Sequence, residues 1–462
     1  MLLSNKKEIE LALAKSDLTK KADNKTCMDL GEVLPITAEI INGHLVVGGV
    51  DMCDLAKKES TALYVLDEKH YRFQMQSYQS AFASHLPGSK VIYASKAFLN
   101  KAAAKIVSEE GLYLDVSGGG ELAIALAAGF DARKIIVHGN NKTPQEIKEA
   151  LTAGVGIIVV DSRVELKRLS EIAASMGKTQ DVYMRVTPGV EADTHEYVRT
   201  GCEDSKFGFT TKNDFAFCCI EDFLNTPNVK LKGLHCHIGS QIFSLNSFEE
   251  AVTIMVEFAA RIEKAYNYKI GELDVGGGLG VAYLSEDKPA SIKDLVARLS
   301  AAFIDACKKY EIEPPVLAVE PGRSIVANAG MTLYTVGIIK TLPNIRKFVA
   351  IDGGMSDNIR TALYHSEYEA VIANKADQPR CEIVTLCGKH CESGDVVAVD
   401  AHLQKADIGD IVCVFGTGAY NYTMASNYNG QPRPAVVFVK DGVARITTRR
   451  ETYSDLMARD ID

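Results

Sequence analysis

Eight short apolar runs, separated by longer segments of helical period, lie between residues 91 and 322 and constrain the fold most strongly. The runs are rich in β-branched residues and apolar throughout, which is typical of parallel strands buried on both faces. The intervening segments, such as VELKRLSEIAASMG and SFEEAVTIMVEFAARIEKAYN, space apolar residues three and four positions apart, as amphipathic helices do. Eight such units in series predict a (β/α)8 barrel. The expected strands are VIYASK (91–96), YLDVS (113–117), KIIVHG (134–139), GIIVVD (156–161), DVYMRVTP (181–188), KGLHCHIG (232–239), ELDVGGG (272–278) and VLAVEPG (316–322).

The segment NNKTPQEI marks one helix start between these strands. Thr143 suits the N-cap, Pro144 suits the first helical position, and Glu146 can complete a capping box. We therefore expect a helix to begin at Pro144.

The chain changes character after residue 330. Runs such as LYTVGIIKTL, KFVAID, CEIVTL and PAVVFV follow one another with turns and little helix, which predicts an antiparallel β domain, expected as a Greek-key barrel. Strand-like runs also precede the barrel and are expected to join that domain. The expected division is an N-terminal extension (1–35), strands joining the β domain (36–68), the (β/α)8 barrel (69–330) and the C-terminal β domain (331–462).

Composition favours small-molecule chemistry in the cytoplasm. The net charge is −9, from 51 basic and 60 acidic residues, without a block of like charge that would bind nucleic acid or an anionic membrane. The N-terminus lacks the apolar core of a secretory signal, and no apolar run approaches the roughly 20 residues of a membrane span. The 11 cysteines are scattered without a CxxC pair, so we expect neither a disulfide framework nor a zinc ribbon.

Polar residues gather where the expected strands end, which is where barrel enzymes carry their sites. Lys96 ends the first strand, where a partly desolvated lysine can form a Schiff base; the alternative is a lysine that snorkels at a strand end. The glycines of LDVGGGLG leave backbone N–H groups free to approach a phosphate, or else they form a tight turn. The other polar residues at these ends are Ser117, His138, Asp161, Arg185, His237, Glu320 and Arg323.

Two motifs near the later strand ends have alternative interpretations. In VEPGRSIV, the Arg323 fork suits a phosphate or carboxylate and Glu320 suits a cationic ring nitrogen; alternatively the two form a structural ion pair. In LHCHIGSQ, strand alternation would put His235 and His237 on one face, as in some metal hydrolases. Because few further ligands accompany them, we favour an imidazole lying flat on a cofactor ring and expect no metal.

In their order along the chain, these motifs closely resemble those of the diaminopimelate decarboxylases, pyridoxal-phosphate enzymes of the alanine-racemase-like barrel class. The resemblance runs from about residue 47 to about residue 429. It is carried by VGGVD, YASKA, VSGGGELAIAL, HGNNK, THEYVRTGCEDSKFGF, HCHIGSQI, GGGLG, EPGRSIVANAG, DGGMSDNIRTALY, CESGD and GAYNYTMASNYN.

The resemblance implies a role for each matching residue. Lys96 would carry the internal aldimine of pyridoxal 5'-phosphate, His237 would stack on the pyridine ring, and Glu320 would hydrogen-bond the ring nitrogen. The residues implied for cofactor binding are Lys96, His237, Ser240, Gly278, Glu320, Arg323 and Tyr420. Those implied for substrate binding are Arg323, Arg360, Tyr364, Glu392 and Tyr420.

The loop GKHCESGD is the last part of the expected site. Taken alone, Cys391 would be a buried core thiol. In the family this loop enters the neighbouring subunit, which implies a homodimer with composite sites, with Cys391 as the proton donor and Glu392 as the partner of a distal ammonium. A carboxylate at Glu320 keeps the ring nitrogen protonated, which favours decarboxylation over racemisation.

The expected reaction is decarboxylation of meso-2,6-diaminopimelate to L-lysine and CO2, the last step of lysine biosynthesis. The nearest alternative is a decarboxylase of the same fold that acts on ornithine, arginine or carboxynorspermidine; Arg360 and Tyr364 argue against substrates without a distal carboxylate. Two alternatives from other classes are a non-catalytic regulatory homologue and a metal hydrolase built on His235 and His237.

Overall fold

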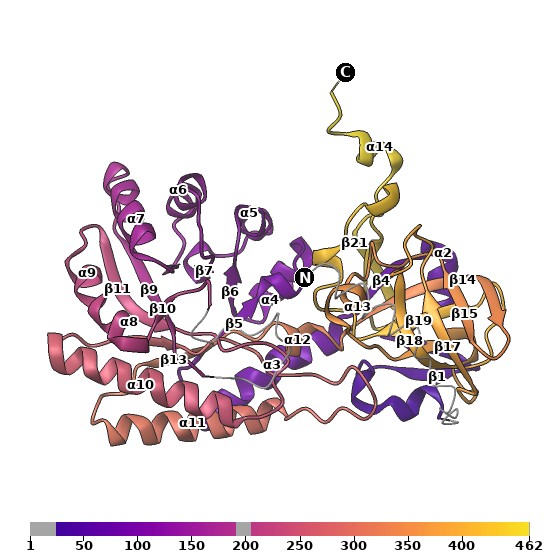
Figure 1. The fold of residues 1–462 in the computed structure, drawn as a ribbon, viewed down its shortest axis with the longest axis horizontal. Helices are drawn as coiled ribbons and strands as arrows, with labels where there is room; N and C mark the ends of the chain where they lie inside the picture. Colours follow the sequence, from indigo (N-terminus) through magenta and orange to yellow (C-terminus); the bar gives the residue numbers. More distant parts are fainter. Residues whose placement is uncertain (1–24, 191–204, 462) are drawn as a thin grey trace. The chain divides into compact units, whose positions relative to one another are not determined.

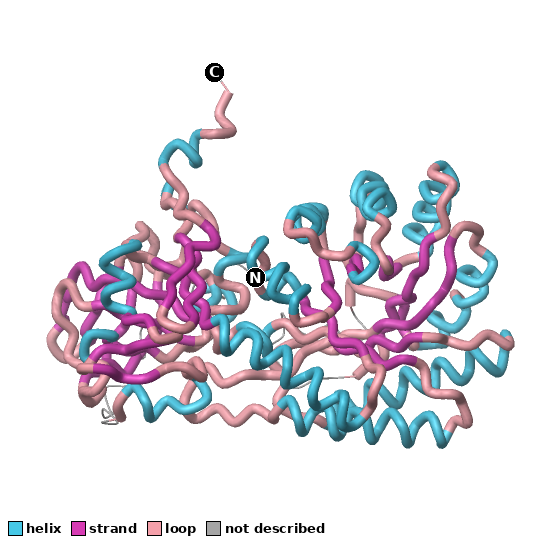
Figure 2. The backbone as a smooth tube through the Cα atoms, turned by 180° about the vertical axis from the view of Figure 1, so that it is seen from behind, coloured by secondary structure: helices cyan, strands magenta, loops and turns pink. Residues whose placement is uncertain are grey.

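The computed structural model describes residues 25–190 and 205–461. The segment THEYVRTGCED of the family motifs, and most of the expected N-terminal extension, lie outside these residues. The chain divides into two compact units (Figures 1 and 2). One comprises residues 72–280 and 289–325, and the other comprises the residues up to Tyr71, residues 281–288 and the residues from Val326 onward.

The first unit is a closed barrel of eight parallel strands, as predicted. Each strand pairs in parallel with the next, and the last pairs with the first to close the barrel. A short strand, β10 (Phe209–Thr210), extends the sheet beside the fifth barrel strand. The barrel strands are β5 (Lys90–Ala94), β6 (Tyr113–Val116), β7 (Ile135–Val137), β8 (Ile157–Val160), β9 (Gln180–Thr187), β11 (Val229–His235), β12 (Glu272–Asp274) and β13 (Val316–Val319).

Helices surround these strands (Figure 1). The predicted capping box forms at Thr143 and Glu146, and the helix that it starts ends at Gly154 in the left-handed conformation. Apolar side chains fill the barrel, among them Ile92, Ile136, Ile157, Val159, Tyr183 and Ala318. The helices are α3 (Glu68–His85), α4 (Lys101–Glu109), α5 (Gly119–Ala127), α6 (Pro144–Ala153), α7 (Arg163–Ser175), α8 (Phe215–Cys218), α9 (Ile220–Asn225), α10 (Asn246–Tyr266), α11 (Ile292–Lys309) and α12 (Arg323–Val326).

The second unit is built on a large, mostly antiparallel sheet. Two of its pairings are parallel, which differs from the fully antiparallel domain expected: β4 (Leu63–Asp67) with β20 (Ala435–Lys440), and β15 (Arg346–Ile351) with β17 (Glu382–Cys387). Parallel neighbours need a long connection, and the whole barrel lies between β4 and β20 in the sequence. The other strands of this sheet are β14 (Gly330–Leu342), β16 (Ala370–Ile372), β18 (Val396–Leu403), β19 (Ile411–Phe415) and β21 (Val443–Thr448).

The segment before β4 forms a small sheet of its own from β1 (Glu39–Ile41), β2 (His44–Val47) and β3 (Val50–Asp51). Its apolar residues share a core with the large sheet that includes Leu45, Val65, Leu333 and Phe415. The α-helices of this unit are α2 (Met52–Glu59), α13 (Arg360–Tyr364) and α14 (Tyr453–Met457), and its 3-10 helices are η1 (Cys27–Val33), η6 (Ala373–Lys375), η7 (Tyr422–Met424) and η8 (Tyr428–Gly430). Within the described residues, no helix is both long and apolar enough to cross a membrane.

Candidate active site

The polar residues expected at the barrel mouth follow the C-terminal ends of their strands. His138, Asp161 and Glu320 come directly after β7, β8 and β13. Arg185 lies within β9, and its Nε is 3.7 Å from Oδ1 of Asp161. Lys96 lies in the short helix η2 (Ser95–Ala97), which follows β5. Strand ends that are distant in the sequence therefore supply a single mouth.

Lys96 is exposed, which differs from the partly desolvated lysine expected. The reason is that η2 carries it past the end of β5, while the neighbouring Ser95 and Ala97 are buried. Its positive charge contributes to lowering the pKa of His237 and opposes the rise in the pKa of Asp115 that burial causes, so the amine acts electrostatically on the barrel mouth. An accessible amine at this position can react with a small carbonyl compound.

Glu320 is the buried centre of the mouth. Its Oε1 lies 2.7 Å from Nε2 of His138, and its Oε2 lies 3.1 Å from Nε2 of His235. Burial by itself would raise the pKa of this carboxyl, but the two imidazoles hold it well below its usual range. Glu320 therefore pairs with two histidines within the described chain and not with Arg323, so the alternative of a Glu320–Arg323 ion pair is wrong.

Two further buried carboxyls surround Glu320. Burial raises the pKa of Asp115, on β6, to about 6, and the charge of Glu320 adds to the rise. Burial and the charge of Glu320 also raise the pKa of Asp274, the last residue of β12, well above its usual value. The mouth thus keeps one carboxylate ionised, while its neighbours hold protons more firmly.

His237 lies two residues beyond the end of β11 and is partly exposed. Desolvation is the main cause that keeps its pKa well below the usual value, with the charge of Lys96 second. A neutral imidazole can lie against an aromatic ring without placing a cation there. Because β11 ends at His235, strand alternation does not extend to His237, and the expectation that the two share one strand face is wrong.

A corner with the chemistry of an anion site lies on the same unit. Nε and one terminal nitrogen of Arg323 donate to Oγ of Ser240 at 3.2 and 3.0 Å. The glycines after β12 let the backbone pack closely: a Cβ on Gly277 would lie 2.0 Å from the carbonyl oxygen of Glu320, and one on Gly278 would lie 2.4 Å from that of Gly239. A guanidinium, a hydroxyl and a side-chain-free loop are suited to a phosphate.

These groups fit pyridoxal phosphate. The cofactor carries an aldehyde, a basic ring nitrogen and a phosphate, and the barrel offers an exposed amine, a buried ionised carboxylate and an anion-binding corner. Lys96, Glu320 and Arg323 with Ser240 are the residues that would hold these three groups.

Arg360 is the central polar residue of the other unit. It begins α13 and is buried, with Nε donating to Tyr368 Oη at 3.1 Å and a terminal nitrogen 3.5 Å from Ser366 Oγ. Its guanidinium carbon lies 5.1 Å from the ring centroid of Tyr364 and 5.3 Å from that of Tyr420. Across the described residues, the guanidinium contacts hydroxyls and rings but forms no ion pair with a carboxylate. Such a buried cation is well suited to bind the carboxylate of a ligand.

The loop that carries Cys391 and Glu392 lies at the surface of the same unit. Cys391 is exposed, so the alternative that its thiol fills the core is wrong. Its backbone N–H donates to Asn429 Oδ1 at 3.0 Å, and Tyr428 Oη donates to Glu392 Oε2 at 3.4 Å. The loop thus presents a thiol and a carboxylate side by side to the outside.

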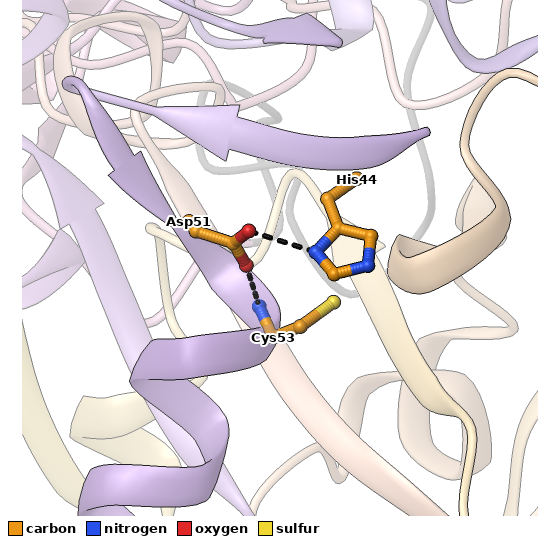
Figure 3. Close-up of side chains that lie close together, drawn as sticks. All are labelled: His44, Asp51 and Cys53. Carbon is orange, nitrogen blue, oxygen red and sulfur yellow. Dashed lines mark hydrogen bonds and ion pairs between the residues drawn. The ribbon is translucent and has the colours of Figure 1, made fainter. Parts of the chain in front are cut away.

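A third group of titratable residues, His44, Asp51 and Cys53, also lies in this unit (Figure 3). Asp51 Oδ1 accepts hydrogen bonds from the N–H groups of Cys53 and Asp54, and its Oδ2 lies 2.7 Å from Nδ1 of His44. Burial raises the pKa of the Cys53 thiol to about 12. These contacts explain the group as the N-cap of α2, with Asp51 as the capping residue.

Asp115, Asp274 and the partnership of His138 and His235 are the site features that sequence reasoning missed. A signal was present for Asp115, which interrupts the otherwise apolar run LDV of β6, and for Asp274, which shares its short buried strand with a second carboxylate, Glu272. A carboxyl within a buried parallel strand is rare unless it is paired or functional.

Comparison with known proteins agrees with this geometry. Residues 72–327 match the family described as pyridoxal-dependent decarboxylase, pyridoxal binding domain. The chain is 45% identical over 420 residues to the diaminopimelate decarboxylase of Bacillus subtilis, which covers 91% of this chain and 96% of that protein.

Solved structures give the same result. The crystal structure of diaminopimelate decarboxylase from M. jannaschii, in complex with L-lysine, has a TM-score of 0.85 and 35% sequence identity over 93% of this chain and 98% of that one. The diaminopimelate decarboxylase from Helicobacter pylori, also complexed with L-lysine, has a TM-score of 0.79 and 29% identity, covering 88% of this chain and 98% of that one. This chain belongs to the diaminopimelate decarboxylases, within the family of pyridoxal-dependent decarboxylases.

Proposed function

We propose that this chain decarboxylates meso-2,6-diaminopimelate to L-lysine and CO2, with pyridoxal phosphate as cofactor, as the last step of lysine biosynthesis. The observation that carries the proposal is the buried Arg360, whose guanidinium contacts hydroxyls and aromatic rings within the described residues. Ornithine lacks a carboxylate at its distal end, whereas diaminopimelate has one. A buried cation stabilises a bound anion strongly, since neither group is then well solvated.

On the barrel, we assign the cofactor contacts by the chemistry of each side chain. Lys96 holds the cofactor through its aldehyde, His237 lies against the ring, and Glu320 accepts a hydrogen bond from the protonated ring nitrogen. Ser240, Gly278 and Arg323 bind the phosphate, as their close packing supports. Bound pyridoxal phosphate supplies the electron sink for the bond that breaks as CO2 leaves.

Arg323 also contacts the substrate from the barrel unit. In the other unit, Arg360 binds the distal carboxylate of the substrate, with Tyr364 and Tyr420 beside it. Tyr420 also touches the cofactor. The backbone of Tyr420 has a φ of 65°. Residues other than glycine rarely adopt this conformation, and it is often found at functional sites.

We assign the last contacts to a homodimer. Cys391 of one chain donates a proton to the substrate carbon that has lost CO2 at the site of its partner, and Glu392 pairs with the distal ammonium. The exposure of the Cys391 loop supports this assignment, because a thiol at the surface is accessible to a second chain.

The test is CO2 release from a panel of amino acids by the purified protein. We expect turnover with meso-diaminopimelate and little with ornithine, arginine or carboxynorspermidine. Strong release from ornithine with none from diaminopimelate would contradict the proposal.

The same preparation tests the alternatives from other classes. A cofactor-loaded enzyme absorbs visible light, and Lys96→Ala should remove the band that depends on the covalent bond to the lysine. A colourless protein after addition of pyridoxal phosphate would favour a non-catalytic homologue, and activity lost to a chelator would favour a metal hydrolase.

A further inference from the structure

Each oxygen of the Glu320 carboxylate lies beside Nε2 of a different histidine: the contact with His235 is a hydrogen bond and that with His138 is a close ion-pair contact. His138 Nε2 lies 2.7 Å from Oε1 and His235 Nε2 lies 3.1 Å from Oε2, and all three side chains are more than nine-tenths buried. The two imidazole rings pack edge to face with their centroids 4.9 Å apart. Each ring therefore limits the movement of the other as well as that of the carboxylate.

The fold fixes this arrangement through the backbone. His138, His235 and Glu320 come from the ends of three strands, β7, β11 and β13, no two of which are neighbours in the barrel. The N–H of His138 donates to Val116 O at 2.8 Å and that of Glu320 donates to Gly276 O at 2.9 Å. Three rigid strand ends thus determine where the carboxylate lies and how it is oriented.

The protonation states follow from the same contacts. Burial lowers the pKa of His235 to about 4, so near neutral pH its imidazole carries no charge and Nε2–H can donate to Glu320. The ionised carboxylate thereby receives a hydrogen bond without a buried cation beside it. The titratable groups around the Glu320 carboxylate are Asp115 on β6, Asp274 on β12, Arg185 on β9 and Lys96 in η2.

We propose that His138 and His235 are positioning residues that keep Glu320 ionised and aimed at the ring nitrogen of the cofactor. This inference rests on the proposed function, because it takes Glu320 as the partner of that nitrogen. The histidines act through Glu320 and contact no reacting atom. Without them, the carboxyl would be buried among Asp115 and Asp274 with fewer donors, and its pKa would rise.

Matched amide substitutions test the proposal at each histidine. The side-chain nitrogen of glutamine reaches about as far as Nε2 of histidine, whereas that of asparagine reaches only about as far as Nδ1. We therefore compare His235→Gln with His235→Asn, and His138→Gln with His138→Asn. Both members of a pair are neutral amides, so a difference between them reports on the donor to Glu320.

The main readout is the protonation of the cofactor itself. Enzyme loaded with pyridoxal phosphate labelled with 15N at the ring nitrogen is measured by solid-state NMR in the resting state, beside kcat and KM. We expect the asparagine variants to move the 15N shift toward that of an unprotonated pyridine and to lower kcat by about tenfold to a hundredfold, with little change in KM. The glutamine variants should stay close to the native enzyme.

His70→Asn is the control for the loss of a buried histidine. His70 lies in the other unit, and its Nδ1 accepts a hydrogen bond from the N–H of Ile36. The His70→Asn variant should have lower thermal stability and an unchanged 15N shift of the cofactor. Asparagine variants with the native shift and native kcat, or glutamine variants as impaired as the asparagine ones, would overturn the proposal. A native protein that binds no pyridoxal phosphate would instead refute the proposed function, before any variant is compared.

Discussion

Nδ1 of His390 lies 2.8 Å from Oδ2 of Asp395, and this pair anchors the loop that carries Cys391 and Glu392. The same carboxylate accepts hydrogen bonds from the N–H of His390 at 2.7 Å and from that of Met355 at 2.6 Å. The His390 ring also stacks on Tyr428, with centroids 5.7 Å apart. The exposed thiol is therefore presented from a buried, fixed base, which suits the contact with a second chain that we propose for it.

This loop leads to a complementation prediction. Cys391→Ala alone should lower turnover by orders of magnitude while the bound cofactor keeps its absorbance, because the role that we propose for the thiol is to supply a proton and not to hold the cofactor. Lys96→Ala alone should be inactive. If the loop acts on the partner's site, hybrid dimers of the two variants contain one intact site, and random mixing should restore about a quarter of native activity.

The measurement is CO2 release after the two variants are unfolded together and refolded, or co-expressed. Mixing Cys391→Ala with itself is the control and should restore nothing. Hybrids that stay inactive although both variants exchange subunits would place the thiol at the site of its own chain or outside the chemistry.

Arg360 gives the prediction on substrate choice. Arg360→Lys keeps the positive charge but removes the planar fork, and Arg360→Met removes both, so the loss of kcat/KM for diaminopimelate should grow from the first to the second. We expect about a hundredfold loss for Arg360→Met, mainly through KM, since a charged hydrogen-bonded pair contributes about 1.5–3 kcal/mol. Steady-state kinetics measure this.

The matched control for Arg360 is Arg298→Met. Arg298 lies on α11 and pairs with Glu249 at 2.5 Å, with 45% of its side chain exposed. Exposed pairs contribute little, so its kinetics should equal those of the native enzyme. An Arg360→Met enzyme with native KM would exclude a carboxylate contact at this residue.

Sequence patterns predicted the barrel well because a buried parallel strand is a local run of apolar residues that can be recognised in the sequence. The apolar run at 135–137 and the capping box at Thr143 depend only on neighbouring residues, and both lie where expected. The pairing of β4 with β20 has no local pattern of this kind, because it joins residues that are separated by almost the whole chain.

The same distinction applies to the candidate site. The sequence places His138 and Glu320 at the ends of expected strands and His235 within the expected strand 232–239, yet it does not say which of these strands face one another across the mouth. That depends on barrel closure and on the rotation of each strand about its axis. Lys96 is exposed because it lies in the short helix η2 and not in β5. A helix of only three residues leaves no periodic pattern in the sequence from which it could be predicted.

Gly277 gives a prediction about the glycine turn. A Cβ there would lie 2.0 Å from the carbonyl oxygen of Glu320, and a backbone atom cannot move away easily. Gly277→Ala should therefore displace the turn, weaken binding of pyridoxal phosphate by at least about tenfold and lower the melting temperature. Fluorescence titration with the cofactor and thermal unfolding measure the two effects.

Gly120→Ala is the matched control for this substitution. Gly120 lies in α5, where an added Cβ meets nothing within 4 Å. The change should leave cofactor affinity unaltered and stabilise the protein by up to about 1 kcal/mol, because alanine favours the helix. Equal cofactor affinity in both alanine variants would mean that the turn tolerates a side chain.

Asp357 gives a prediction of pH dependence. Burial raises its pKa from 3.8 to about 7, and the charges of Asp395 and Asp352 add to the rise, against hydrogen bonds from Tyr334 and the N–H of Gly354. The folded protein therefore keeps a proton on this carboxyl that the unfolded chain releases. The resulting stabilisation is fully present below about pH 3.8 and is lost as the pH rises through about 7.

Asn at this position cannot ionise, so Asp357→Asn should remove this contribution. Between about pH 5 and about pH 8, the free energy of unfolding of the native protein should fall relative to that of the variant by about 2–3 kcal/mol, since each pKa unit corresponds to about 1.4 kcal/mol. Urea unfolding of both proteins at the two pH values measures the difference. Asp305→Asn, whose side chain is 78% exposed, should keep the native pH dependence. Parallel pH profiles for the native protein and Asp357→Asn would show that the carboxyl is already ionised in the folded protein near pH 5, because a network of donors offsets its burial.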